Sequence, residues 1–346
     1  MADPVLKTLL LPLETGTIEL PAGAKTLFLR ARMDQSLKDA AFEMLTCEQS
    51  FAPDRDALER AGFSVKPEVT DGDFDLVLIL PTRQKQEARA LLARAVQKAK
   101  PGGIVLACAA NTEGAKTAES DLKKLAGLEG NMSKNKCRVF WTVVQPEAVD
   151  GELLSEWSAL DAERDVLDGA YRSRPGVFAW DRIDPASQLL ADRLPETLSG
   201  KGADLGAGFG FLSRTVLQRC PKVTGMDLYE AEKRALDLAE KNLAEFRGKR
   251  QLNGIWSDVT RGIEGPYDFI VSNPPFHQGG KADRADVGQG FIRAAASGLR
   301  SGGLFYMVAN RHLPYEQTLR DVFDHVEMIA DEGGYKVIKA IKRKGK

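Results

Sequence analysis

The chain of 346 residues contains the same order of hydrophobic and glycine signals twice. Residues 74–81 (FDLVLILP) resemble 267–274 (YDFIVSNP), residues 100–106 (KPGGIVL) resemble 300–306 (RSGGLFY), and residues 137–141 (CRVFW) resemble 335–339 (YKVIK). These pairs start 193, 200 and 198 residues apart. Two unrelated domains of one class would share part of this pattern, but three matches at nearly constant separation favour a duplicated domain.

Hydrophobic segments and amphipathic segments alternate through the second half of the chain. We expect strands at 202–205, 223–226, 252–256, 269–272, 304–308, 325–329 and 335–341, and helices at 211–219, 231–246 and 290–299. This alternation is typical of an α/β domain with a doubly wound, mainly parallel seven-stranded sheet covered on both faces. Since one core rarely serves so long a chain, we predict domains at 1–150 and 185–346. Residues 151–184, with a helix near 153–167, form the predicted linker and junction.

Composition excludes several classes of protein. With 43% hydrophobic and 28% charged residues the chain is that of an ordinary globular protein, and it has no apolar run long enough to span a bilayer and no signal peptide, so we expect no membrane association and a cytoplasmic location. Four scattered cysteines and three histidines predict neither a disulfide framework nor a metal site. The net charge of −1 argues against a general nucleic-acid coat, but leaves room for a local basic patch.

A glycine turn follows the first expected strand of the second half. Gly206, Gly208 and Gly210 are spaced G-x-G-x-G, whereas a dinucleotide-binding turn is spaced G-x-G-x-x-G and here has Phe at its third glycine position. Asp204 lies two residues before the turn, where dinucleotide-binding strands have an apolar residue. A carboxylate at that place suits the methionine ammonium group of S-adenosylmethionine.

Two further aspartates follow the next two expected strands. We expect Asp227 to end the second strand and to accept both ribose hydroxyls, and Asp258, at the tip of the third, to meet the adenine amine. Each aspartate taken alone is as well explained as a helix cap. Carboxylates after three consecutive strands are harder to explain as caps, because parallel sheets bind ligands at that edge. We therefore predict S-adenosylmethionine as the cofactor, with no metal.

The tetrapeptide Asn273-Pro274-Pro275-Phe276 follows the fourth expected strand, beside the point where the strand order should reverse. Two prolines after a strand also make a rigid turn without any function. An aromatic amine is a poor nucleophile, however, because its lone pair is delocalised into the ring. The Asn273 amide oxygen and the Pro274 carbonyl can accept its two N–H bonds and align its nitrogen with a sulfonium methyl group. Phe276 offers a face on which a base stacks, and the neighbouring His277 is interpreted as a polar rim residue rather than a base.

The motifs around this tetrapeptide resemble one family. The segments 176–178 (GVF), 184–190 (DPASQLL), 204–210 (DLGAGFG), 273–279 (NPPFHQG), 308–319 (VANRHLPYEQTL) and 333–341 (GGYKVIKAI) are similar to those of the bacterial ribosomal RNA small subunit methyltransferase C family. The resemblance is close over about residues 174–341. In the first half of the chain it rests mainly on the order of the expected strands and helices. Asp258 departs from the family, in which relatives can have Asn.

This resemblance implies two tandem Rossmann-like class I methyltransferase domains, of which the first is degenerate and serves RNA recognition or structural support, and the second methylates guanine N2 in 16S rRNA. Residues 25–34 (KTLFLRARMD) stand in place of the first domain's glycine turn, and Leu80 stands in place of Asn273, so we expect that domain to be catalytically silent. The implied partner is ribosomal RNA, in the 30S subunit or an assembly intermediate, and a monomer is expected.

The resemblance also implies residues around the site. Ser187, Gln188 and Phe178 would border the cofactor and the base, with Ser187 among the cofactor contacts. Cations near the site would contact RNA phosphates, although each taken alone is equally a solvated surface charge: Arg172, Arg174, Lys281, Arg284 and Arg311.

Three alternative functions remain open from the sequence. A sister group of the family methylates guanine N2 in 23S rRNA, and protein-glutamine or small-molecule N-methyltransferases share the tetrapeptide without the duplicated architecture. A non-enzymatic RNA-binding or assembly factor would not require an intact Asn273 beside an intact glycine turn.

Overall fold

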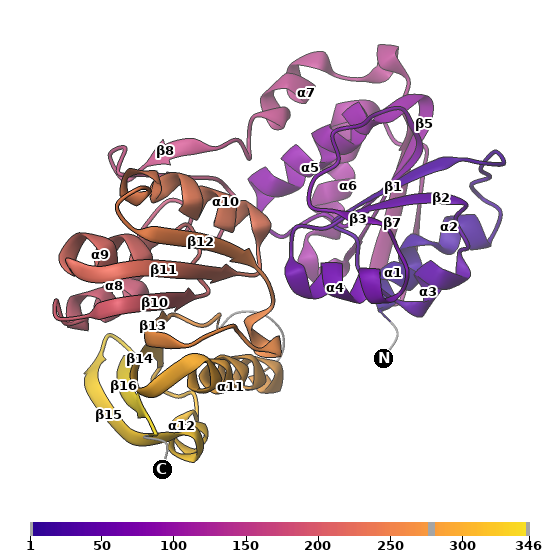
Figure 1. Ribbon diagram of the computed structural model, residues 1–346. Helices are drawn as coiled ribbons and strands as arrows, with labels where there is room; N and C mark the ends of the chain where they lie inside the picture. The colour runs from indigo at the N-terminus through magenta and orange to yellow at the C-terminus, as the bar shows by residue number, and fades with distance from the viewer. Residues whose placement is uncertain (1–2, 276–280, 344–346) are drawn as a thin grey trace. The chain divides into compact units, whose positions relative to one another are not determined.

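The computed structural model describes residues 3–275 and 281–343, with the side chains of 281–285 outside that description. The chain forms two compact units (Figure 1). The first unit contains Met1–Glu163 and Arg174–Gly176, and the second contains Arg164–Ser173 and Val177–Lys346.

The first unit is built from seven strands and seven α-helices among its described residues. In chain order these are α1 (Pro4–Leu9), α2 (Leu11–Glu14), β1 (Lys25–Leu29), α3 (Gln35–Asp39), β2 (Met44–Glu48), α4 (Ala52–Arg60), β3 (Val65–Lys66), β4 (Phe74–Ile79), α5 (Lys85–Lys98), β5 (Ala99–Ala110), α6 (Ala115–Ala126), β6 (Gly130–Lys134), β7 (Cys137–Val143) and α7 (Gly151–Ser158).

The second unit begins with a small hairpin and continues as an α/β domain. Its elements are β8 (Arg164–Val166), β9 (Tyr171–Ser173), α8 (Pro185–Arg193), β10 (Ser199–Leu205), α9 (Phe211–Arg219), β11 (Lys222–Glu230), α10 (Lys233–Asn242), β12 (Gln251–Trp256), β13 (Tyr267–Ser272), α11 (Lys281–Gly298), β14 (Leu299–Asn310), α12 (Glu316–Val322), β15 (Phe323–Glu332) and β16 (Tyr335–Lys342).

The two large sheets have the same strand order. It is β3-β2-β1-β4-β5-β7-β6 in the first unit and β12-β11-β10-β13-β14-β16-β15 in the second. Five neighbouring strands are parallel in each sheet, and the last two pairings are antiparallel. The predicted mainly parallel seven-stranded sheet and the two-domain Rossmann-like architecture are thereby confirmed.

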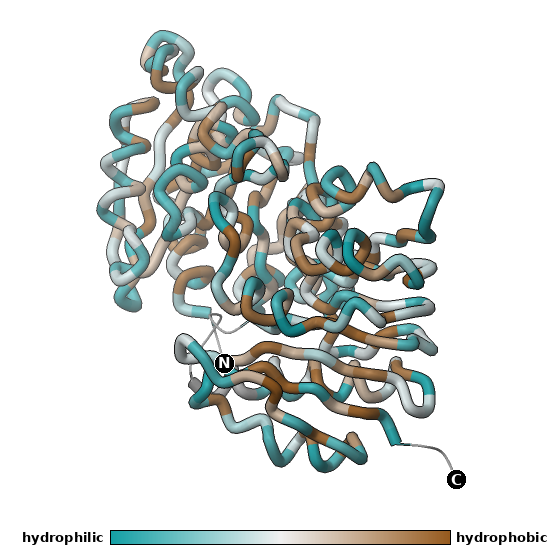
Figure 2. The backbone as a smooth tube through the Cα atoms, turned by 90° about the vertical axis from the view of Figure 1, so that its left-hand side faces the viewer, coloured by the Kyte–Doolittle hydropathy of each residue, from teal (hydrophilic) through white to brown (hydrophobic). Residues whose placement is uncertain are grey.

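Each sheet separates two hydrophobic layers, because successive strand residues point to opposite faces. In the second unit, Leu190 of α8, Val216 of α9 and Leu236 of α10 pack on one face, while Ile292 of α11 and Leu319 of α12 pack on the other. Hydrophobic residues gather along the strands in Figure 2. A doubly covered sheet leaves only its strand ends for a binding site.

The predicted linker is divided between the units instead of standing apart. Helix α7 ends at Ser158, not near 167, and its buried Trp157 packs into the core of the first unit. Strands β8 and β9 follow it and belong to the second unit. The helix expected at 231–246 starts at Lys233 and ends at Asn242. In the part of the chain that the structure describes, no helix is both long and apolar enough to cross a membrane.

Candidate active site

The second sheet reverses its strand order between β10 and β13, which lie side by side. The glycine turn leaves the C-terminal end of β10, and Asn273 follows the C-terminal end of β13. A Cβ atom built on Gly206 would lie 3.7 Å from the backbone oxygen of Asn273, so the two motifs are neighbours. In open α/β sheets, this crevice is where ligands bind.

The glycine turn needs glycine for conformation and for open space. Gly206 has φ 77° and Gly208 has φ 55°, which L side chains rarely adopt. No atom of the described chain lies within 4 Å of a Cβ atom built on Gly208. Helix α9 starts directly after Gly210, so its N-terminal end lies at the turn and favours a negatively charged or electron-rich ligand group.

Asp204 lies at the base of this turn and is fully buried. Its Oδ2 accepts hydrogen bonds from the backbone N–H (3.1 Å) and the hydroxyl (2.7 Å) of Ser213 in α9. Its Oδ1 is buried and has no hydrogen-bond partner among the described residues. Burial, which the Ser213 bonds oppose, raises the pKa of Asp204 to about 7. A cationic donor would satisfy this oxygen, so the residue fits the ammonium group of S-adenosylmethionine.

Asn273 presents the other unpaired acceptor of the site. Its Nδ2 donates to Asp184 Oδ2 (2.9 Å) and to Ser187 Oγ (2.8 Å), which both lie at the start of α8. Its Oδ1 is buried and accepts no hydrogen bond within the described part of the chain. An unpaired buried amide oxygen costs about 1–3 kcal/mol, so its retention is explained by a ligand that donates to it.

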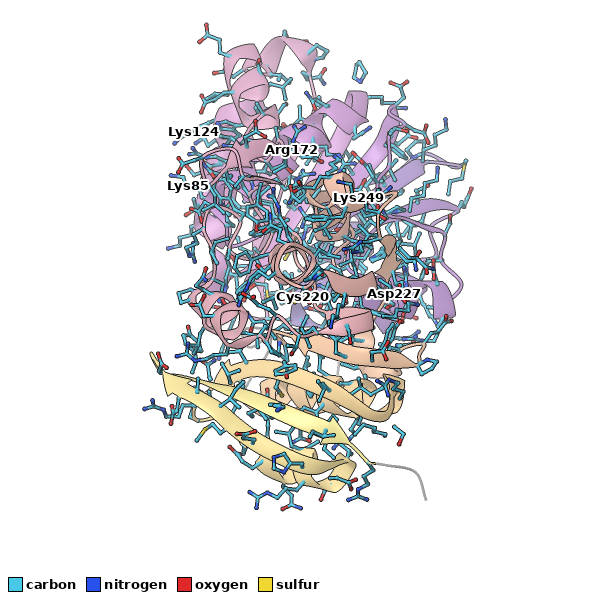
Figure 3. All side chains as sticks on the ribbon, turned by 60° about the vertical axis from the view of Figure 1, so that its left-hand side comes forward. Lys85, Lys124, Arg172, Cys220, Asp227 and Lys249 are labelled. Atoms are coloured by element: carbon cyan, nitrogen blue, oxygen red, sulfur yellow. The ribbon has the colours of Figure 1, made fainter. Side chains whose placement is uncertain are left out.

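Asp227 is not at the tip of its strand, and this part of the sequence prediction is wrong. Strand β11 continues through the buried residues Leu228 and Tyr229 to Glu230. The Asp227 carboxylate, labelled in Figure 3, is buried. It bonds with Lys201 Nζ (2.6 Å), Tyr267 Oη (2.7 Å) and Asn253 Nδ2 (2.7 Å). These three bonds hold Asp227 inside the sheet, and its contact with the ribose stays a prediction.

Glu230 occupies the strand end that was assigned to Asp227. Its Oε2 accepts the backbone N–H of Gly208 (2.7 Å), and its Oε1 accepts that of Glu232 (2.8 Å). Burial raises the pKa of this carboxyl group above its ordinary value, although these backbone bonds oppose the shift. The sequence contains a signal for this residue, because the hydrophobic residues Leu228 and Tyr229 continue the strand beyond Asp227 to Glu230.

Asp258 acts as a cap in the structure. Its Oδ1 accepts the backbone N–H (2.9 Å) and the hydroxyl (2.6 Å) of Thr260, and so begins the short 3-10 helix Val259–Arg261. Its Oδ2 lies 3.7 Å from Arg261 Nε. The capping explanation is thus sufficient for Asp258, and a contact with adenine stays a prediction.

The first unit has a different side chain at each place that corresponds to Asp204, Gly206, Glu230 and Asn273 of the second unit. The backbone N–H of Ala31 donates to Glu48 O as that of Ala207 donates to Tyr229 O, which aligns Gln49 with Glu230. Gln49 Oε1 accepts a backbone N–H two residues ahead, as Glu230 Oε1 does. By the same register Phe28 replaces Asp204, Arg30 replaces Gly206 and Leu80 replaces Asn273. Arg30 keeps a positive φ of 56° and donates to the Leu80 backbone oxygen (3.0 Å).

The remaining predicted contacts lie in different surroundings. Phe178 is 56% exposed, and the Gln188 amide is engaged with Asp192 (2.8 Å). Arg172 of β9 (Figure 3) is exposed, and its Nε lies 3.9 Å from Asp165 Oδ1. Arg311 is also exposed, and its Nε lies 2.5 Å from Asp331 Oδ1. Arg174 belongs to the first unit and is paired with Asp161 (2.6 Å). Pro274 is buried and Pro275 exposed.

The side chains of three predicted residues fall outside the described part of the structure. Phe276 lies in the segment 276–280, and Lys281 and Arg284 lie at the start of α11, where only the backbone is described. The neighbouring His277 lies in the same segment. Among the side chains that are described, no group of three His, Cys, Asp or Glu residues is placed to hold a metal ion.

Known proteins resemble this chain along most of its length. The family model described as "Methyltransferase small domain" matches residues 169–339. The ribosomal RNA small subunit methyltransferase C of Salmonella newport is 31% identical over 81% of this chain and 79% of its own length. The Shigella flexneri protein of that name is 30% identical over 93% of this chain and 89% of its own.

A solved structure has the same two-unit plan. It is described as "T. Thermophilus 16S rRNA N2 G1207 methyltransferase (RsmC) in complex with AdoMet and Guanosine". The match has a TM-score of 0.78 at 25% sequence identity and covers 99% of this chain and 92% of that one. Since fold, site and sequence similarity agree, this chain belongs to the ribosomal RNA small subunit methyltransferase C family and is a methyltransferase.

Proposed function

We propose that this protein transfers a methyl group from S-adenosylmethionine to the exocyclic N2 amine of a guanine in 16S rRNA. The observation that most supports this function is the buried Oδ1 of Asn273 beside the glycine turn, because this acceptor has no hydrogen-bond partner among the described residues and could accept an amine N–H. Relatives named for small-subunit rRNA methylation, and a related structure solved with AdoMet and guanosine, support the choice of donor and base.

The second unit offers a group for each part of the cofactor. Asp204 would hold the methionine ammonium through its unpaired Oδ1, and Glu230 would hold the ribose hydroxyls from the end of β11. Gly206, Gly208 and Gly210 would let the backbone approach it closely. Asp258 remains the candidate for the adenine amine, and Ser187 borders the site through Asn273. The bound cofactor supplies an electrophilic methyl group on a positively charged sulfur.

Asn273 would perform the main chemical task of the chain. Its Oδ1 accepts one N–H of the guanine amine and the Pro274 backbone carbonyl accepts the other, which orients the nitrogen lone pair away from both. Two acceptors also favour a more tetrahedral nitrogen, in which the lone pair is less delocalised into the ring. As the nitrogen gains its methyl group it becomes acidic and releases a proton to solvent. No strong general base is required from the protein.

Recognition of the RNA would use aromatic and cationic side chains around this acceptor. Phe276 and the exposed Phe178 are candidates for stacking on a base. Arg172 and Arg311 in the second unit are candidates for phosphate contacts, as are Lys281 and Arg284 in α11 and Arg174 in the first unit. The substrate would be the 30S subunit or an assembly intermediate in the cytoplasm, bound by a monomer whose first unit supports RNA recognition and has no turnover of its own.

Transfer of labelled methyl groups tests this function directly. Purified protein with tritiated S-adenosylmethionine should label 16S rRNA in 30S particles or their assembly intermediates, and nuclease digestion should release the label as N2-methylguanosine. The particles should come from a strain that lacks the gene, so that the site is unmethylated. Label confined to 23S rRNA, to protein or to a small molecule would contradict the proposal and favour one of the alternative substrates.

Cofactor affinity should depend on pH through Asp204. Its pKa is raised to about 7, so the carboxyl group is largely neutral below that pH and holds an ammonium group poorly. We expect S-adenosylmethionine to bind about tenfold more tightly at pH 7.5 than at pH 6, measured by calorimetry with one site per chain. Asp204→Asn should make this dependence shallower. Equal pH dependence in the variant would contradict the assignment.

The same pKa shift predicts the sign of a stability change. Because the folded-state pKa of Asp204 is raised, the contribution of this group to stability is fully present below its ordinary value of 3.8 and is lost as the pH rises through about 7. Bound cofactor should oppose this loss by pairing with the carboxylate.

A further inference from the structure

The side-chain amide of Asn273 has two ends of similar shape and opposite hydrogen-bonding character. Within the described residues only its NH2 end has partners, namely Asp184 Oδ2 at 2.9 Å and Ser187 Oγ at 2.8 Å. Rotation by 180° about the last side-chain bond would exchange the oxygen and the nitrogen. The proposed acceptor for the guanine amine would then become a donor and would repel it. Something must therefore fix which end faces the crevice.

Of the two partners, only Asp184 can fix this orientation. A carboxylate accepts hydrogen bonds and donates none, so a rotated amide would place its oxygen against another oxygen at about the same short distance. A serine hydroxyl both donates and accepts, so Ser187 tolerates either end of the amide. Asp184 therefore provides the asymmetry, and Ser187 adds a second bond.

Asp184 is itself held by the local structure of α8. It is the N-cap residue of this helix, and Pro185 occupies the first helical position, where its fixed φ suits the turn. The same Oδ2 that binds Asn273 accepts the backbone N–H of Ser187 at 2.9 Å. The carboxylate is thus anchored to its own helix and reaches a residue 89 positions away in the sequence.

The first unit has a matching helix start without the second contact. Asp3 is the N-cap of α1 and is followed by Pro4, and both α1 and α8 pack on the corresponding strands of their sheets. Asp3 pairs with Arg32 (3.1 Å), and the place of Asn273 is taken by Leu80. Capping alone therefore accounts for the Asp-Pro pair in both units. The contact with an active-site amide is specific to the second unit.

We infer that Asp184 is a positioning residue that sets the orientation of the Asn273 amide, so that an acceptor and not a donor faces the methyl-accepting amine. This inference rests on the proposed function for the role of Asn273. The orientation itself is a property of the protein without substrate, and it can be measured separately from activity.

The test uses Asp184→Ser in the full-length protein. Serine is also a good N-cap residue, so the start of α8 should be retained, but its shorter hydroxyl both donates and accepts, so the obligatory acceptor for Asn273 is lost. We expect kcat with 30S particles to fall about 10- to 100-fold, because a hydrogen bond to a charged group is removed and the amide populates both orientations. The Kd for S-adenosylmethionine should stay within about twofold. Ser187→Ala should cost only about threefold in kcat, because a neutral bond is lost.

A control and a direct spectroscopic measurement complete the test. Asp150 caps α7 in the first unit through the backbone N–H of Leu153, so Asp150→Ser repeats the chemical change and should leave kcat unchanged. The side-chain 15N–1H resonances of Asn273, assigned by their absence from the Asn273→Ala spectrum, should exchange slowly with solvent in the wild type and quickly in Asp184→Ser.

The outcomes separate the inference from the proposed function. Unchanged kcat and unchanged amide exchange in Asp184→Ser would overturn the inference. If the wild-type protein labels no rRNA, the proposed function fails, while the exchange measurement still decides whether Asp184 holds the amide.

Discussion

Replacing Asn273 with alanine should abolish nearly all methyl transfer while leaving the methyl donor bound. The variant removes the buried acceptor Oδ1 and the two bonds of Nδ2. Loss of one oriented group that stabilises a transition state costs about 10²–10³-fold in kcat, and we expect the upper end here because the nucleophile is a weak aromatic amine. Single-turnover transfer of labelled methyl groups to 30S particles measures this loss.

The matched control for this prediction is Asn131→Ala. Asn131 is an exposed asparagine in β6 of the first unit, so its truncation should change neither transfer nor cofactor binding. Calorimetry should give Asn273→Ala a Kd for S-adenosylmethionine close to that of the wild type. A large loss of affinity, or transfer at the wild-type rate, would contradict the role assigned to Asn273.

The second large effect is expected at Glu230. Its two carboxylate oxygens accept the backbone N–H groups of Gly208 and Glu232, and each retains capacity for a ribose hydroxyl. Glu230→Gln leaves one oxygen to serve two backbone donors and removes the charge. We expect the Kd for S-adenosylmethionine to rise about 100-fold, since bonds to charged groups contribute about 1.5–3 kcal/mol each.

Asp227→Asn provides the contrasting variant. It removes the ionic partner of Lys201 and an acceptor of Tyr267 inside the sheet. The cost should appear as about 1–3 kcal/mol of lost folding stability, measured by urea denaturation, with little change in cofactor affinity. Lost affinity in Asp227→Asn with intact affinity in Glu230→Gln would restore the original assignment to Asp227.

The first unit has the same strand order as the second, with different side chains at the places that correspond to the site. Gln49 stands where Glu230 stands and accepts the same backbone N–H two residues ahead. Phe28 and Leu80 stand in place of Asp204 and Asn273, the two residues whose Oδ1 atoms have no partner among the described residues. Arg30 even retains the positive φ of a glycine turn. The sheet and its turns are thus compatible with either set of side chains, so the chemistry depends on a few polar groups and not on the fold.

Local patterns in the sequence were sufficient for the architecture. The repeated strand and glycine signals predicted both sheets, because hydrophobic periodicity and turn chemistry act between residues close in the chain. The same holds for the glycine turn, Asp204 and Asn273. The glycine turn and Asn273 follow directly on their strands, and Asp204 is the last but one residue of β10. They come together because the C-terminal ends of neighbouring parallel strands meet at one edge.

The length of a strand and the partners of a side chain were decided only by the folded structure. Whether β11 ends at Asp227 or at Glu230 depends on its pairing with β10 and β12, and that pairing buries Asp227 among Lys201 and Asn253. Likewise, Trp157 packs in the core of the first unit and so attaches α7 to it, although the sequence predicted a linker over these residues. Such outcomes result from contacts between distant segments, and a local window does not contain both partners.

The sequence by itself therefore determined that this chain has two similar sheets and that only the second keeps an amide next to a glycine turn. Only the tertiary structure decided which acid stands at the end of β11 and which way the Asn273 amide faces. The second point depends on one carboxylate, Asp184, that lies 89 residues away and is brought within 2.9 Å by the packing of α8 on the sheet. Hydrogen-bond direction is set by the partner on the other side, and folding alone brings that partner into place.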